Sequence, residues 1–216
     1  MKKLLTLFAA ISMLFVACSK DDEGGTSSNP LPPMSDPEDV CTAMDDIDFM
    51  KYCYTFFDVN KDGKVSIAEA EAVQVMEDFY CRELIGTDPY YGPSYKTLWE
   101  VTSLKGIEYF KNVTTLSIDY CQISQKEVDL SRLTKLHTLR FGYVGTSKLC
   151  VAGNYLSYIY LFALSSLDLY VTSITPCNLR YIYLTPGSNI YVPYSAVDAY
   201  KTTEGWKEYA DRIYGY

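Results

Sequence analysis

Apolar residues in the second half of the chain recur in a fixed frame, in which the first, fourth and sixth positions are aliphatic or aromatic. The frame begins at residues 113, 136, 156 and 179, so successive starts lie 23, 20 and 23 residues apart. This spacing is typical of leucine-rich repeats, in which each repeat adds one strand to a parallel stack. The frames are Val113/Leu116/Ile118, Leu136/Leu139/Phe141, Leu156/Ile159/Leu161 and Leu179/Ile182/Leu184. A fifth frame, Leu164/Leu167/Leu169, falls between two of these and fits the return side of a coil.

Residues between the apolar positions should face outward, because side chains alternate along a strand. In two frames both outward positions are tyrosine, and the two pairs lie 23 residues apart, so we expect Tyr158 and Tyr160 to stack in register with Tyr181 and Tyr183. Large amphipathic rings lose little entropy on contact, so the pattern predicts a face that binds a protein or a glycan. The alternative is that tyrosine simply covers a short sheet in a chain with 21 tyrosines.

The first half of the chain shows helical spacing of apolar residues over 45–57 and 66–80, with a polar segment between. This segment, Asp58 to Glu69, matches the EF-hand loop pattern, and Gly63 stands where the loop turns with positive φ. Calcium takes six to eight oxygen ligands. The pattern therefore predicts a Ca²⁺ site that uses side-chain oxygens and, at Lys64, the backbone carbonyl; its residues are Asp58, Asn60, Asp62, Lys64, Ser66 and Glu69. The alternative is a polar turn between two helices.

The excess of negative charge is concentrated around this loop. Residues 36–85 contain 13 acidic and 4 basic residues, whereas residues 86–216 contain 11 acidic and 12 basic residues. Local acidity of this kind suits a cation-binding segment. The formal net charge of −8 argues against nucleic acid as a partner.

The N-terminus has the pattern of an export signal. Lys2 and Lys3 precede an apolar run over 4–16 that is too short to span a bilayer, so residues 1–17 are predicted to be a signal peptide. The ending at Ala17-Cys18 resembles a bacterial lipobox, which implies that Cys18 is lipidated. The alternative is an ordinary signal peptide that is cut near Ala17. Residues 18–37 are rich in Gly, Ser and Pro and should form a flexible tether, so the lipid anchor would be the membrane contact.

The whole chain resembles the BspA-like leucine-rich-repeat surface lipoproteins of Bacteroidetes. The resemblance is carried by the leader and the segments 58–73, 104–110, 190–193, 198–201 and 205–210. It implies an α+β fold, with an EF-hand-like helical cap over 38–86 and a short leucine-rich-repeat solenoid with parallel strands and a C-terminal cap over 87–216. The sequence departs from the family in a Tyr/Gly/Pro-rich stretch over 87–96 and in the small number of repeats.

The resemblance also implies an address and a function. An acidic cluster directly after Cys18 resembles a surface-export signal, so we expect an outer-membrane lipoprotein exposed at the cell surface; the periplasmic orientation is the alternative. The implied function is recognition or adhesion, through a host or microbial protein or glycan bound on the repeat face. The alternative function is a glycan-capturing or carbohydrate-active surface protein.

Candidate catalytic residues are few. His137 is the single histidine and falls at an outward position, and the best acidic pair, Asp119 and Asp168, would lie on an open sheet without an enclosing pocket. We therefore expect no enzyme activity, although the composition permits a carboxylate-only glycosidase. An even number of cysteines in an exported chain permits disulfides, and the sequence leaves their pairing open. These cysteines are Cys41, Cys53, Cys81, Cys121, Cys150 and Cys177.

Overall fold

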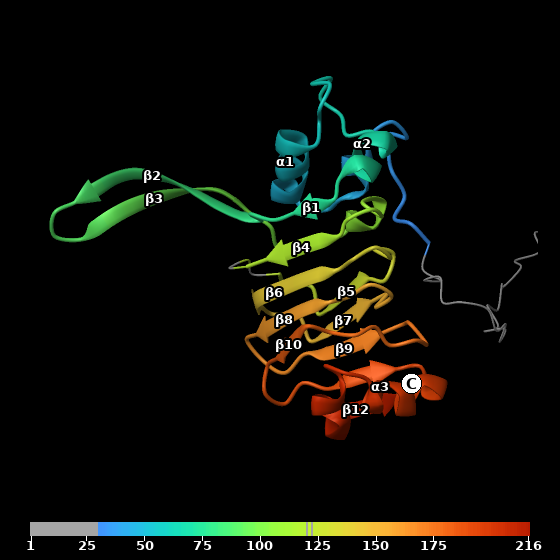
Figure 1. Cartoon of the computed structure of the whole chain (residues 1–216). Helices are drawn as coiled ribbons and strands as arrows, with labels where there is room; N and C mark the ends of the chain where they lie inside the picture. Colours follow the sequence, from blue (N-terminus) through green and yellow to red (C-terminus); the bar gives the residue numbers. More distant parts are fainter. Residues whose placement is uncertain (1–29, 120, 122) are drawn as a thin grey trace, which may run out of the picture.

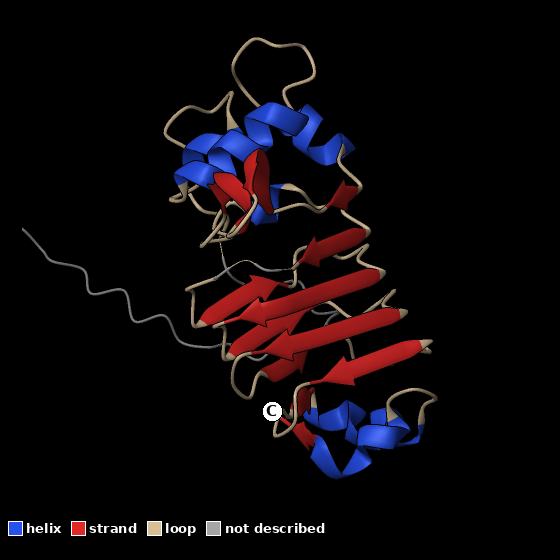
Figure 2. Ribbon diagram, turned by 90° about the vertical axis from the view of Figure 1, so that its left-hand side faces the viewer, coloured by secondary structure: helices blue, strands red, loops and turns tan. Residues whose placement is uncertain are grey.

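The computed structural model of the chain describes residues 30–119, 121 and 123–216. It mixes helix and strand: two parallel five-stranded sheets form the body, and helices lie at both ends (Figure 1 and Figure 2). The predicted signal peptide, Cys18 and most of the predicted tether lie outside the described residues. Within the described ranges, no helix is long and apolar enough to cross a membrane.

The N-terminal cap consists of η1 (Val40–Ala43), α1 (Ile47–Phe56) and α2 (Ile67–Ala72). Asp46 begins α1, because its carboxylate accepts hydrogen bonds from the N–H groups of the first turn. Ser66 begins α2 with a capping box, in which its hydroxyl accepts from the Glu69 N–H and the Glu69 carboxylate accepts from the Ser66 N–H. A helix–loop–helix unit is therefore present where the sequence predicts one.

Two expectations for these helices are corrected. The second helix, predicted to reach residue 80, ends at Ala72, and the chain continues into β1 (Val75–Met76), which pairs in parallel with β4 (Thr115–Ile118). Val75 is β-branched and favours a strand, and pairing with β4 outweighs the helical spacing of the sequence. In α1, the apolar spacing over 45–57 includes Ile47 in the predicted inner face, but Ile47 is 64% exposed, whereas Phe49 and Cys53 are fully buried.

The chain passes alternately between the two sheets as it advances. The front sheet has the strand order β1-β4-β6-β8-β10, and the back sheet has the order β12-β11-β9-β7-β5. The further front strands are β4 (Thr115–Ile118), β6 (Thr138–Val144), β8 (Tyr158–Ala163) and β10 (Tyr181–Leu184). The back strands are β5 (Glu127–Leu130), β7 (Lys148–Val151), β9 (Asp168–Val171), β11 (Ile190–Val192) and β12 (Ile213–Gly215).

The repeated apolar frame sets the register of the front sheet. Leu116 pairs with Leu139, Leu139 with Ile159 and Ile159 with Ile182, so equivalent frame positions lie side by side. The predicted parallel strands are therefore confirmed. The fifth frame supplies β9 of the back sheet, where Leu169 is buried, and so lies on the return side of a coil as expected.

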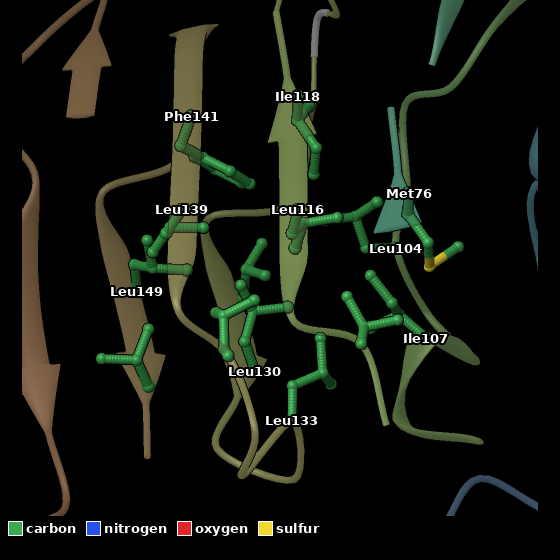
Figure 3. Close-up of a cluster of buried hydrophobic side chains, with 14 of the residues drawn as sticks. Met76, Leu104, Ile107, Leu116, Ile118, Leu130, Leu133, Leu139, Phe141 and Leu149 are labelled. Carbon is green, nitrogen blue, oxygen red and sulfur yellow. The ribbon is translucent and has the colours of Figure 1, made fainter. Parts of the chain in front are cut away.

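The core lies between the two sheets. Figure 3 shows Leu116 and Ile118 of β4 and Leu139 and Phe141 of β6 extending from the front sheet into the space that Leu130 and Leu149 of the back sheet also fill. The cluster also includes Met76 of β1, Leu104, and Ile107 of the short helix η2 (Ile107–Tyr109). It continues into the N-terminal cap through Phe49 and Val65. The N-terminal cap and the two sheets therefore share one continuous apolar core.

A long antiparallel hairpin, β2 (Tyr80–Asp88) and β3 (Gly92–Glu100), extends away from the body (Figure 1). Tyr90 and Tyr91 in its turn are both 93% exposed. The hairpin includes the Tyr/Gly/Pro-rich stretch over 87–96, and the predicted domain boundary at residue 86 falls inside β2.

The far end of the body is covered by η3 (Tyr194–Ala196), α3 (Val197–Thr202), η4 (Lys207–Arg212) and strand β12, which pairs with β11. Trp206 is fully buried there, and its Nε1 donates a hydrogen bond of 2.8 Å to the Cys177 carbonyl. Short helices and strand β12 therefore cover this end of the body.

Candidate calcium loop and candidate recognition face

The first half of the loop is folded by its own carboxylates and amide. Asp58 accepts from the Asp62 N–H through Oδ1 (3.2 Å) and from the Gly63 N–H through Oδ2 (3.0 Å). Asn60 Oδ1 accepts from the Asp62 N–H at 2.9 Å, while Asn60 Nδ2 donates to Asp62 Oδ2 at 3.0 Å. Gly63 has φ of 84°, as predicted for the sharp turn. Three of the predicted ligands are thus held together.

Glu69 links the two ends of the loop. Its Oε1 accepts from the Val59 and Asn60 N–H groups at 3.0 and 3.3 Å, and its Oε2 accepts from the Ser66 N–H and hydroxyl at 2.9 and 2.8 Å. These hydrogen bonds, with the Ser66 N–H contributing most, hold the pKa of the Glu69 carboxyl below its ordinary value. Glu69 is therefore kept as an anion at the place where the EF-hand pattern requires one.

The back of the loop is attached to the cap. Val65 is fully buried, its N–H donates to Asp39 Oδ1 at 3.1 Å, and its carbonyl accepts from the Val40 N–H at 2.9 Å. The Lys64 ammonium lies against Asp36 (3.1 Å) and Glu38 (2.8 Å) of the N-terminal segment. Since this cation is paired outside the loop, Lys64 can offer its carbonyl without placing its charge near a bound ion.

The fit of a calcium ion can be judged from these donors. Within residues 30–119, 121 and 123–216, no three carboxylate, thiol or imidazole groups stand close enough together to hold a metal ion. Asp58, Asp62 and Glu69 instead direct oxygens at backbone N–H groups of the loop. The residue types nonetheless fit Ca²⁺: the five side-chain donors are all oxygens, all five lie on the loop that turns at Gly63, and the loop is exposed or half-buried at every position except Val65.

The four predicted tyrosines come together on the outer side of the front sheet. Tyr158 is in register with Tyr181, and Tyr160 with Tyr183, as the 23-residue spacing predicts. The first pair has ring centroids 4.8 Å apart with planes at 18°, and the second has 5.3 Å and 22°. The predicted stacking is therefore confirmed, and the binding role of these residues stays a prediction.

The stacked rings turn their faces toward one another. One face of Tyr160 lies against Tyr183, and the Arg140 guanidinium lies over the Tyr160 ring at 5.3 Å from the centroid. Arg140 is itself held by Asp119, with Nε and Nη2 at 3.1 and 3.0 Å from Oδ2. Arg140, Tyr160 and Tyr183 thus lie side by side on three neighbouring strands, and Asp119, directly after β4, holds Arg140 at one end of this row. Because the two rings stack along the row, they turn their edges outward.

Sequence reasoning missed a second tyrosine stack, on the back sheet. Tyr170 and Tyr191 have centroids 4.6 Å apart with planes at 12°, and Tyr214 continues the stack at 5.9 Å from Tyr191. Lys148 lies over the Tyr170 ring at 5.0 Å. The signal that finds this stack is a repeated triplet of an apolar residue, tyrosine and a small or apolar residue at 169–171, 190–192 and 213–215.

The candidate catalytic residues are not brought together. Asp119 follows β4 on the front sheet, whereas Asp168 lies in β9 of the back sheet and accepts from Asn189 Nδ2 at 3.2 Å. His137 is exposed, as expected, and stacks on Tyr155 with centroids 5.7 Å apart. Asp119 and Asp168 are therefore on different sheets and do not form an acidic pair.

Comparison with known proteins found no relative of the chain. No family model, no curated protein and no solved structure matches it.

Proposed function

We propose that the chain is a calcium-stabilised recognition module, held at the outer membrane by a lipid on Cys18 and displayed at the cell surface, with the front sheet as its contact surface. In this proposal the two-sheet coil is a short leucine-rich-repeat solenoid, and the helix–loop–helix cap is EF-hand-like. The observation that carries the proposal is the pair of tyrosine stacks formed by Tyr158, Tyr160, Tyr181 and Tyr183.

The geometry of the stacks favours a protein partner. Flat contact with a sugar uses an exposed ring face, whereas Tyr160 has its faces against Tyr183 and Arg140. Outward-facing edges and hydroxyl groups suit hydrogen bonds and edge contacts with another protein surface. The proposed partner is therefore a host or microbial protein. It would bind the ordered, flat aromatic surface that the front sheet of this chain presents.

Calcium has a structural role in this proposal. Asp58, Asn60, Asp62, Ser66 and Glu69 would supply side-chain oxygens and Lys64 its carbonyl, and the ion would offset the negative charge of the loop. The loop joins α1 to α2 and is attached to η1 through Asp39 and Val65. A bound ion would therefore stabilise the cap against the coil and would not need to drive a change of shape.

Binding to an array of matrix proteins and glycans tests the contact surface. The full chain is compared with Tyr158→Ala/Tyr181→Ala on the front sheet and with Tyr170→Ala/Tyr191→Ala on the back sheet, which removes an equivalent stack. We expect protein binding that the front variant loses by at least tenfold and the back variant keeps. Equal binding by all three proteins would contradict the proposal that the front sheet is the contact surface.

A glycan ligand is the second candidate, and one observation favours it. At Gly142 and Val144 the pairing of β6 with β8 shifts, and the intervening Tyr143 has φ of 60° and is 46% exposed. Its ring lies 5.0 Å from that of Phe162. Bulges re-aim side chains next to binding sites. The test is binding of the full chain and of Tyr143→Ala, which keeps the stacked tyrosines, to a polysaccharide. Binding that Tyr143→Ala abolishes would support a glycan ligand in place of a protein partner.

A further inference from the structure

Tyrosine hydroxyls from the two caps bind backbone groups at both ends of the front sheet. At one end, the Tyr52 hydroxyl of α1 donates to the carbonyl of Glu77, directly after the outermost strand β1, at 2.7 Å and accepts from the Glu77 N–H at 3.2 Å. At the other end, the Tyr209 hydroxyl of η4 donates to the Ile182 carbonyl of the outermost strand β10 at 3.1 Å. Covering an edge strand in this way protects it from pairing with another chain.

The arm, which consists of β2, β3 and the turn between them, differs from the front sheet. Each strand has nine residues, and within residues 30–119, 121 and 123–216 the two strands pair only with each other. The arm extends away from the body (Figure 1), and its residues 82–84, 86 and 87 are all exposed. A two-stranded hairpin is only marginally stable by itself in water, and its outer backbone groups are a template for a further strand.

Of the two strands, β2 is better suited to pair outward. Pro93 in β3 has no N–H to donate, whereas β2 contains no proline. The base of β3 is also joined to the N-terminal cap, since the Glu100 N–H donates to Asp48 Oδ2 at 3.2 Å. In β2, the pairing with β3 shifts at Ile85, which has no partner in the register of β3. The centre of β2 therefore keeps hydrogen-bonding groups for a strand on its other side.

The order of charges along β2 indicates which strand fits there. Arg82 is near the base of the arm and Asp88 is near its turn, with Ile85 midway between them. Two parallel copies of β2 would place like charges opposite each other. Two antiparallel copies centred on Ile85 instead place Arg82 of each copy opposite Asp88 of the other, and opposite charges on neighbouring strands stabilise a sheet. The strand is therefore complementary to a second copy of itself.

We propose that two copies of the chain associate through their arms, with β2 of one copy antiparallel to β2 of the other. The arms then form one four-stranded sheet with the order β3-β2-β2-β3, and a two-fold axis passes through its centre at Ile85. In this register the turn of each arm reaches the base of the other arm. Tyr90 and Tyr91, both 93% exposed in the turn, then lie beside the start of β2 of the other copy. This association does not rest on the proposed binding role of the front sheet.

Sedimentation equilibrium of the full chain tests the association. We expect the average mass to rise towards that of two chains as the protein concentration increases from about 1 to 500 μM, because one pair of short strands is a small interface and binds weakly. The variant in which a short Gly/Ser linker replaces residues 82–98 should keep the mass of one chain throughout. A wild-type chain that stays monomeric, or an armless variant that still dimerises, would overturn the proposal.

A charge exchange tests the antiparallel register itself. Arg82→Asp and Asp88→Arg each place like charges opposite each other when the variant pairs with itself, so each should raise the dissociation constant by about tenfold or more. An equimolar mixture of the two variants should dimerise like wild type, because opposite charges then face each other at both ends of the strand pair. Two variants that dimerise as tightly alone as when mixed would contradict this register.

Asp198→Arg is the matched control for this exchange. It changes the net charge as much as Asp88→Arg does, but it lies on an exposed position of α3 in the C-terminal cap and should dimerise like wild type. Weaker association of this control would assign the effect to net charge and contradict the role of the arm. A monomeric wild type whose binding to the protein array is lost without the arm would assign the arm to another protein and also overturn the proposal.

Discussion

At the scale of single residues, Asp46 joins the N-terminal cap to the coiled body. Its Oδ1 accepts from the Asp48 and Phe49 N–H groups at 2.8 and 2.9 Å and so begins α1. Its Oδ2 accepts from the Thr102 N–H (2.7 Å), the Thr102 hydroxyl (2.8 Å) and the Ser103 N–H (3.0 Å). One nearly buried carboxylate therefore satisfies five donors from two distant segments.

Asp46→Asn should destabilise the fold by about 1–3 kcal/mol, because the amide cannot accept from donors on both sides. Denaturant unfolding measures the change. Asp45→Asn is the matched control: Asp45 is exposed and accepts a hydrogen bond from the Ser103 hydroxyl at 2.7 Å, so its loss should cost less than about 0.5 kcal/mol. An equal loss of unfolding free energy in the two variants would show that Asp46 does not connect the N-terminal cap to the body.

The same carboxylate predicts a pH dependence. Burial alone would raise the pKa of Asp46, but the hydrogen bonds from Phe49, Thr102 and Ser103 outweigh it and hold the pKa below its ordinary value. Its contribution to stability is therefore present above the unfolded pKa of about 4 and is lost as the pH falls through the folded pKa. In unfolding experiments between pH 7 and pH 2, the difference between wild type and Asp46→Asn should shrink at the acid end. A constant difference would contradict this role.

At the scale of elements, the C-terminal cap depends on a close backbone approach at Gly205. This residue has φ of 83°, and a Cβ there would lie 2.6 Å from Leu179 Cβ and 2.8 Å from the Leu179 carbonyl oxygen. Gly187 has nearly the same φ of 84°, but a Cβ would meet Ser166 only at 3.8 Å. The two glycines therefore separate the cost of the backbone conformation from the cost of a clash.

Gly205→Ala should destabilise the chain by about 2–4 kcal/mol, since a β-carbon would force the cap away from the loop before β10. Gly187→Ala should cost about 1 kcal/mol, which reflects the left-handed conformation alone. Calorimetric melting of both variants measures the difference. If the two substitutions cost the same, the packing of the cap against Leu179 would not be tight.

The hairpin formed by β2 and β3 is an element that the body should be able to lose. Its ends lie side by side, because the Val101 N–H donates to the Phe79 carbonyl at 3.2 Å. Replacing residues 82–98 with a short Gly/Ser linker should therefore shift the melting temperature by less than about 2 °C. A larger loss would show that the arm stabilises the body.

The sequence predicts some of these elements better than others. The front strands are predictable because their frame combines strand alternation with a fixed spacing, and Leu116, Leu139 and Ile159 do align. The end of α2 cannot be predicted in this way, because Val75 joins a strand whose partner lies 40 residues further along the chain. For the candidate loop, the pattern predicts the turn at Gly63 and the position of Glu69, but it does not predict that the carboxylates point at backbone N–H groups.

At the scale of the whole molecule, one core connects a helical cap, a two-sheet coil and a C-terminal cap. The N-terminal cap contributes Phe49 and Ala70 to the same cluster as Leu116 and Leu139 of the front sheet. An ion in the loop of residues 58–69 would therefore stabilise the two sheets as well as the N-terminal cap, because the cap and the sheets share this core. The candidate calcium loop and the tyrosine face thus pack on the same core.

Calorimetric melting of the full chain with and without Ca²⁺ measures whether calcium stabilises the fold. For an affinity in the range of about 10⁻⁴–10⁻³ M, Ca²⁺ at about 10 mM should raise the melting temperature by about 3–8 °C. Asp58→Ala should abolish the increase, while Asp45→Asn, outside the loop, should keep it. An unchanged melting temperature in wild type, or an equal increase in Asp58→Ala, would contradict the account.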